Sequence, residues 1–131
     1  MVHADHSSTV SYTDSQTEIV SVAPTGEAVG YALHLEKGLR ILHARDTAPY
    51  GDMKLFGDRY KPDVAMLPIG DHFTMGPEDA AEAASMWGVK TVIPMHYGTF
   101  PVLTGTVEAL RRALNPQIKL LAPAPGGTVE F

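Results

Sequence analysis

Residues 64–95, VAMLPIGDHFTMGPEDAAEAASMWGVKTVIPM, carry the pattern that decides the fold of this chain of 131 residues. Val64–Ile69 is a continuous apolar run, as expected of a β-strand that is covered on both faces. Pro77 at a first helical position, followed by two acidic residues, predicts a helix that ends at Gly88. A second short apolar run, Thr91–Met95, comes next. The stretch therefore predicts a strand, a helix and another strand in succession.

The segment before this stretch predicts a β-hairpin and then a helix. In Val29–Leu35, the large apolar residues fall on one face of the chain, and Gly30, Ala32 and His34 fall on the other. This period of two is typical of a half-buried strand. Residues 36–38 form a polar turn, and Leu39–Ala44 predicts the returning strand. Asp52 is a candidate N-cap for a helix that Pro62 stops.

The two ends of the chain show weaker patterns. Residues 1–5 are typical of the end of a strand, and residues 7–27 predict a loop with a short strand at Ile19–Val22. The elements predicted after residue 95 are a helix capped by Thr106 and stopped by Asn115-Pro116, then strands at Ile118–Leu121 and Thr128–Phe131.

The order of these elements predicts an α/β fold. A hairpin followed by alternating strands and helices favours a mixed sheet that is covered by helices on one or both sides. No internal repeat, low-complexity tract or linker divides the sequence, so we expect residues 1–131 to form a single domain.

Composition excludes several classes of protein. The net charge is −5, and no block of Lys or Arg is present, which argues against nucleic acid or an anionic membrane surface as the main partner. The absence of Cys excludes disulfides and thiolate zinc sites. No apolar run approaches the roughly 20 residues that span a bilayer, and no signal-peptide pattern begins the sequence. We therefore expect a cytoplasmic protein.

Residues that could bind a metal follow the predicted strands. His6, Asp46, His72 and His96 each come after a strand, where loops gather functional groups. Imidazole and carboxylate are suitable ligands for zinc, manganese or iron. His6, Asp46 and His96 are separated by 40 and 50 residues, so only the fold can bring them together.

Structural roles compete with each of these assignments. A single His after a strand is more often a hydrogen-bonded structural residue than a ligand, and Asp46 could be a turn residue. His34 and His43 lie inside predicted strands and are interpreted as structural. Asp71 and His72 could serve either loop structure or substrate contact.

Two further segments favour the metal interpretation. Residues 52–78, DMKLFGDRYKPDVAMLPIGDHFTMGPE, and residues 93–101, IPMHYGTFP, resemble an uncharacterised family of metal-dependent hydrolases in the metallo-β-lactamase superfamily. The similarity runs from His6 to the end of the chain. A related branch of this superfamily includes sugar-phosphate lactonases.

The resemblance implies a fold and a site. The fold is an αββα sandwich of two similar halves with a dinuclear site between the sheet edges, and this chain corresponds to the C-terminal half. His6 and His96 would each bind one metal, expected to be zinc with manganese or iron as alternatives, and Asp46 would bridge the two ions. A hydroxide would then attack an ester, lactone or phosphoester bond. Asp46 and His72 are the implied catalytic residues, and His72, Tyr97 and Thr99 the implied substrate contacts.

Two departures from the family pattern point to an incomplete site. The H-x-H-x-D-H motif of the first half is absent, because Met1 stands where its first His would be, and we do not expect His3 or Asp5 to bind metal. Arg45 stands where the family has Gly before the bridging Asp.

The missing half also predicts a partner. A half sandwich leaves one sheet face uncovered, so we expect a homo-oligomer, a complementing N-terminal half, or a truncated species of low activity. The alternative function is a non-catalytic assembly module. A phosphate-binding domain is less favoured, because no Gly-rich phosphate loop follows any strand.

Overall fold

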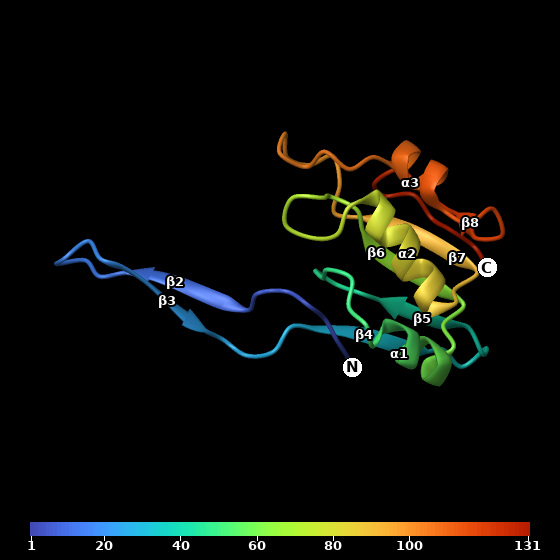
Figure 1. The fold of residues 1–131 in the computed structure, drawn as a ribbon, viewed down its shortest axis with the longest axis horizontal. Helices are drawn as coiled ribbons and strands as arrows, with labels where there is room; N and C mark the ends of the chain where they lie inside the picture. The colour runs from blue at the N-terminus through green and yellow to red at the C-terminus, as the bar shows by residue number, and fades with distance from the viewer.

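The apolar run after residue 63 becomes a central strand, β6 (Val64–Pro68), in the computed structural model, which describes residues 1–131. It pairs in parallel with β5 (Arg40–His43) on one side and β7 (Thr91–Met95) on the other. The full sheet has six strands in the order β1-β4-β5-β6-β7-β8 (Figure 1). The predicted mixed sheet is therefore confirmed.

The hairpin and the edge strands complete this sheet. β4 (Val29–His34) pairs antiparallel with β5, as predicted. β1 (Val2–His3) pairs antiparallel with β4, and β8 (Lys119–Leu120) pairs in parallel with β7. The predicted strand at Thr128–Phe131 is wrong, since these residues form no strand. Two prolines and two glycines in residues 123–127 separate them from β8, and the chain turns away from the sheet there.

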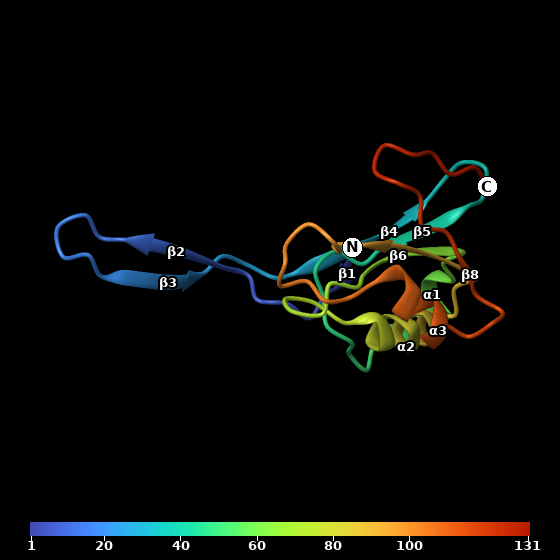
Figure 2. The ribbon, with the colours of Figure 1, turned by 90° about the horizontal axis from the view of Figure 1, so that it is seen from above.

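Three helices cover one face of the sheet. They are α1 (Met53–Tyr60), α2 (Pro77–Trp87) and α3 (Val107–Ala113), and Figure 2 shows all three on the same side. The Thr106 hydroxyl accepts a hydrogen bond from the Ala109 N–H at 3.1 Å, which confirms the predicted cap. Asp52 occupies the N-cap position of α1, but its side chain makes no capping hydrogen bond. None of these helices has the length and apolarity that crossing a membrane requires.

The core forms where α2 packs on β5, β6 and β7. Leu42, Ala65 and Val92 are neighbours across the sheet in one row, and each is fully buried. They belong to the same cluster as the alanine stripe of α2 and Trp87. Small alanine side chains let the helix lie close to the sheet, and the burial of this row stabilises the fold.

A two-stranded arm extends away from this body (Figure 1). β2 (Thr9–Thr13) and β3 (Val20–Pro24) form it, with five paired positions. The prediction of a loop over residues 7–27 is therefore wrong, although the strand predicted at Ile19–Val22 overlaps β3. Asp14 accepts hydrogen bonds from two backbone N–H groups at the turn, and β-branched residues favour the strands. The arm packs on no core, so it lacks the clear alternation that marks a strand in sequence.

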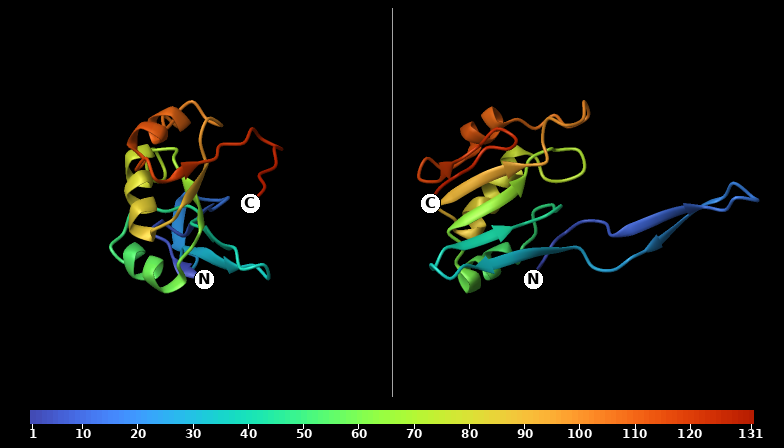
Figure 3. Two further views of the ribbon diagram at one scale, coloured as in Figure 1. Left: turned by 90° about the vertical axis from the view of Figure 1, so that its right-hand side faces the viewer. Right: turned by 180° about the vertical axis from the view of Figure 1, so that it is seen from behind.

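The face of the sheet opposite the helices remains apolar. Met66 and Ile93 are direct partners there, Ile41 lies in the adjacent row, and all three lie outside the buried core cluster. On β4, Tyr31 pairs with His43 and Leu33 pairs with Ile41, and these two β4 residues are 40% and 45% exposed. The C-terminal segment projects on this side, as Figure 3 shows.

One residue, Asp63, joins the beginnings of β5, β6 and β7. Asp63 forms a bidentate pair with Arg40, with both N–O distances at 3.1 Å, and also accepts the backbone N–H of Arg40. Its backbone carbonyl accepts hydrogen bonds from the N–H groups of Lys90 and Thr91. A single residue thus connects β5, β6 and β7 at the edge where these strands begin.

We predict a pH-dependent contribution to stability from this carboxylate. The Arg40 guanidinium holds the pKa of Asp63 below its ordinary value of 3.8. A carboxyl group with a lowered pKa stabilises the folded state above its unfolded-state pKa, and that contribution disappears as the pH falls through the folded-state value. Asp63→Asn should therefore lower the free energy of unfolding by about 1 kcal/mol at pH 7, measured by urea denaturation. This difference should shrink below pH 3.8.

The matched control is Asp58→Asn, since the Lys54–Asp58 pair is about 70% exposed on both sides. Its effect should be near zero at every pH. An Asp63→Asn variant as stable as the wild type at pH 7 would remove the assigned role of this residue.

Candidate metal centre

The candidate site lies at the edge of the sheet where the parallel strands end. Because β5, β6 and β7 are parallel, the loops that follow them leave from the same edge. Asp46 follows β5, His72 follows β6 and His96 follows β7. The parallel alignment of the strands thus brings these residues, which are far apart in sequence, to the same edge of the sheet.

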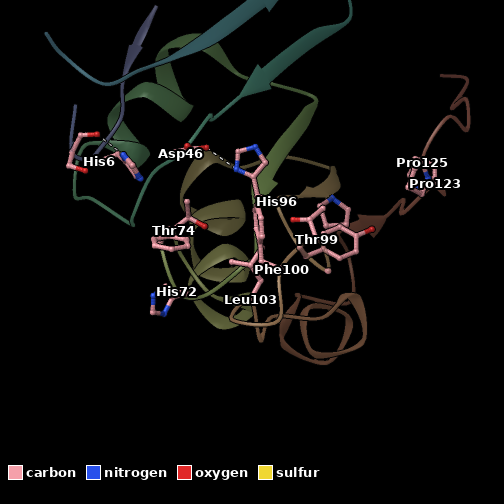
Figure 4. A pocket seen from close by; sticks show the side chains of 15 residues that line it. His6, Asp46, His72, Thr74, His96, Thr99, Phe100, Leu103, Pro123 and Pro125 are labelled. Carbon is pink, nitrogen blue, oxygen red and sulfur yellow. Dashed lines mark hydrogen bonds and ion pairs between the residues drawn. The ribbon is translucent and has the colours of Figure 1, made fainter. Parts of the chain in front are cut away.

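Asp46 and His96 are in direct contact. The Nδ1 atom of His96 lies 2.8 Å from a carboxylate oxygen of Asp46, and Figure 4 shows the two side chains facing each other. Both are half-exposed, at 45% and 47%. His96 has a φ of 55°, which is rare for a residue with a side chain and marks the turn that brings the ring to this position.

His6 lines the same cavity but does not touch this pair. Its Nδ1 lies 2.7 Å from the carbonyl oxygen of Ser7, and its ring sits to one side of Asp46 in Figure 4. No three His, Asp or Glu side chains of the chain come close enough together to hold a metal ion. The structure therefore brings together two of the three predicted ligands, and the metal assignment for His6, Asp46 and His96 stays a prediction.

The cavity around these side chains has a volume of about 1110 Å³ and is open to solvent. Its wall contains His6, Asp46, His72, His96, Tyr97 and Thr99, which are the six residues that the sequence proposed for the site. The ring of His72 packs edge-on against Phe73, with 4.4 Å between the ring centres. Such a volume is ample for a small-molecule substrate.

Asp71 has a structural role, whereas substrate contact by His72 stays a prediction. The Asp71 carboxylate accepts a hydrogen bond from the Thr104 hydroxyl at 2.8 Å. This bond ties the loop after β6 to the segment before α3.

Gly70 lets the loop after β6 approach the loop after β7. A Cβ added to Gly70 would lie 2.5 Å from the carbonyl oxygen of His96, so only glycine permits so close an approach.

Thr47 anchors the loop that carries Asp46, a role that no local sequence pattern predicts. Its side chain is 1% exposed. The hydroxyl oxygen accepts the backbone N–H of Asp5 at 2.9 Å and donates to the carbonyl of Ala48 at 2.8 Å. The segment that carries His6 is thereby joined to the segment that carries Asp46.

Asp5 and His3 make structural contacts with the residues that follow Thr47. Asp5 forms an isolated β-bridge with Ala48. The His3 ring packs edge-on against Tyr50, whose hydroxyl donates to the His3 carbonyl. Burial, with the nearby carboxylates Asp52 and Asp5, raises the pKa of Tyr50 to about 12. Neither Asp5 nor His3 lines the cavity.

Arg45 adopts the left-handed backbone region, with a φ of 61°. Its N–H lies 3.2 Å from Nδ1 of His43, which accepts this hydrogen bond in the neutral form of the ring. Burial lowers the pKa of His43, and the cation of Arg45 lowers it further. The charge of Arg45 therefore lies close to the candidate site.

The residues present have the donor chemistry of a metal site. Three imidazoles, those of His6, His72 and His96, and the carboxylate of Asp46 line one cavity, and nitrogen and oxygen ligands of this kind suit zinc, manganese or iron. Asp46 and His96 are in direct contact with each other. The donors therefore fit a divalent metal in kind, although only this pair is assembled.

Comparison with known families gives one family match. The family described as "Beta-lactamase superfamily domain" matches residues 1–97. Among curated proteins, a UPF0173 metal-dependent hydrolase of Myxococcus xanthus is 51% identical over 106 residues, which are 79% of this chain and 38% of that protein. A UPF0173 metal-dependent hydrolase of Cupriavidus metallidurans is 44% identical over 133 residues, which are 99% of this chain and 46% of that protein.

Solved structures show the same similarity. A metallo hydrolase from the archaeon Ignicoccus hospitalis superimposes with a TM-score of 0.70 at 32% identity, covering 98% of this chain and 51% of that one. An isothiocyanate hydrolase from gut bacteria of Delia radicum superimposes with a TM-score of 0.64 at 24% identity, covering 81% and 44%, which is a likeness of fold. The chain thus spans about half the length of the relatives that it matches.

We predict that Thr47→Val loosens the site and lowers the free energy of unfolding by about 1–2 kcal/mol, because the part-buried N–H of Asp5 loses its acceptor while the side-chain volume is kept. Urea denaturation measures the loss. Amide hydrogen exchange should also become faster at Asp5 and Ala48. Thr74→Val, at a cavity-lining Thr without a side-chain hydrogen bond, is the control and should change neither quantity. Unchanged exchange at Asp5 would contradict the anchoring role.

Proposed function

The chain belongs to the beta-lactamase superfamily domain family, and on this premise we propose that it provides one wall of a metal-dependent hydrolase site. The contact between Asp46 and His96 at 2.8 Å carries the proposal. These two residues come from different loops, 50 residues apart, and meet at the edge of the sheet where ligand sites of layered α/β folds form. The names of the relatives support hydrolysis with a metal.

In this proposal, His6, Asp46 and His96 hold the metal, with zinc as the expected ion. When bound, such an ion lowers the pKa of water and supplies hydroxide near neutral pH, so an ester, lactone or phosphoester bond is the proposed target. For Asp46 and His96 to hold the same ion, the 2.8 Å contact between Nδ1 and the carboxylate must open so that the ion lies between them. For His6 to join them, its ring must turn away from the Ser7 carbonyl.

The other cavity residues have proposed roles with the substrate. His72 is proposed to move a proton at the leaving group, because its ring lies on the cavity wall and has no hydrogen-bond partner in the chain. Tyr97 and Thr99 are proposed to bind and orient the substrate through their hydroxyls. Phe73, Phe100 and Leu103 provide an apolar wall that restricts water.

We predict that the chain binds Zn²⁺ through these side chains. Isothermal titration should show one ion per chain, and His96→Ala or Asp46→Ala should weaken binding by at least about tenfold, since each removes a ligand from a set that is already small. His6→Ala should weaken binding in the same way.

His34→Ala is the matched control. His34 is an exposed imidazole that pairs with Arg40 in the sheet, at the opposite edge from the site. Its loss should leave the affinity for Zn²⁺ unchanged. Equal metal content in the wild type and in His96→Ala would remove His96 from the proposed site.

We further propose that the apolar face of the sheet is covered by a second layer, from another copy or from a complementing half. Ile41, Met66 and Ile93 are flanked there by the exposed side chains of Tyr31 and Leu33. Exposed apolar faces of this kind favour association. The greater length of the relatives supports the presence of such a layer. A non-catalytic assembly module is the alternative function that this face favours.

Sedimentation of the full chain tests this association. We expect a species at least twice the mass of 14.1 kDa, and Leu33→Lys together with Ile93→Lys should shift it to the monomer mass. Leu55→Lys is the control, because Leu55 is 62% exposed on α1, on the other side of the sheet. A folded wild-type monomer would contradict coverage of this face by another copy.

A further inference from the structure

A second pocket adjoins the candidate metal centre at the base of the arm. Its volume is about 330 Å³, and it lies between the segment that enters β2 and the start of β4. His6 and Asp46 line this pocket and also the larger cavity, so the two spaces meet at the proposed ligands. A molecule bound at those ligands can therefore reach into both.

The smaller pocket differs from the larger cavity in chemistry. The larger cavity has an aromatic and aliphatic wall. The smaller pocket is lined by hydroxyl-bearing residues, including Ser7, Thr9 and Tyr31, by one cation, Arg45, and by the acidic residues Glu27 and Asp46. Hydroxyl donors together with a guanidinium are the groups that bind phosphate and carboxylate.

Arg45 has no structural partner that explains its presence. Its guanidinium forms no ion pair and no hydrogen bond within the chain, although Glu27 lines the same pocket. It is exposed, and its backbone has a φ of 61°, a conformation that a side chain disfavours. Strained backbone of this kind occurs at ligand sites, where the position of the side chain matters more than local stability.

We propose that Arg45 and this pocket form a subsite for an anionic group of the substrate, either a phosphate or a carboxylate. The proposal rests on the proposed function in one respect, which is that the bound molecule is the substrate of the adjacent site. Arg45 immediately precedes Asp46, so an anion held by its guanidinium lies next to the proposed ligands and positions the rest of the substrate in the larger cavity. Arg45 is then a specificity-determining residue, since its planar guanidinium suits two-point binding of an oxyanion.

Anion titrations without metal test the subsite independently of the hydrolase proposal. The full chain in EDTA is titrated by calorimetry with inorganic phosphate and, separately, with acetate at constant ionic strength. We expect Arg45→Gln to raise the dissociation constant of the favoured anion at least about tenfold, and Arg45→Lys to restore part of the affinity. Tighter binding of phosphate or of acetate identifies the group that the subsite accepts.

Three further variants separate a ligand-binding role from a structural one. Glu27→Gln should strengthen anion binding, because it removes a like charge from the pocket. Arg45→Gly should abolish binding and raise the midpoint of thermal unfolding, since glycine adopts the left-handed conformation without strain. Arg59→Gln, at an exposed Arg of α1 without an ion pair, is the control for loss of charge and should leave anion binding unchanged.

Either of two results with the Arg45 variants would overturn the subsite, and so would a third result obtained with Zn²⁺. One is equal anion affinity in the wild type and Arg45→Gln, and the other is a lower unfolding temperature in Arg45→Gly together with unchanged binding. Anion binding that requires Zn²⁺ and ignores Arg45 also assigns the anion to the metal and rejects the subsite. Anion binding that depends on Arg45 in EDTA would support the subsite even if the Zn²⁺ titrations with His96→Ala contradict the hydrolase proposal.

Discussion

The parallel alignment of β5, β6 and β7 is the constraint on which the rest of the structure depends. The row Leu42, Ala65 and Val92 is fully buried beneath the alanine stripe of α2, and this burial holds the three strands in register. Parallel strands end at one edge, so their loops must leave side by side. The contact between Asp46 and His96 is a direct result of that arrangement.

Strained backbone is concentrated at this edge. Arg45, Asp71 and His96 all have positive φ values, and they follow the ends of β5, β6 and β7 respectively. Non-glycine residues persist in this region only where surrounding contacts hold them. Thr47 and the bond between Asp71 and Thr104 provide such contacts, because they fix the loops from which the cavity side chains project. The site is therefore held by buried polar contacts of the loops as well as by the sheet.

The two faces of the sheet have different consequences for function. Helices cover one face and form the core, while the other remains apolar and open to a further layer. The relatives are about twice as long as the matched region, and in the proposed function the additional layer and the remaining ligands belong together. The arm and the Arg45 pocket lie beside the ligands on this chain, so recognition of one part of the substrate resides in the residues described here.

The local elements and the candidate side chains could be predicted from short stretches of the sequence. The apolar run at Val64–Ile69, the Pro77 start and Gly88 end of α2, and the residues after each strand are all visible as short-range patterns, because strand and helix periodicity is local. Only the tertiary structure decided which of these side chains meet. It paired Asp46 with His96 and left His6 apart, placed all helices on one face, formed the arm from a predicted loop, and buried Thr47 as an anchor. Those outcomes depend on contacts between residues far apart in the chain, which strand pairing and core packing select and no local pattern records.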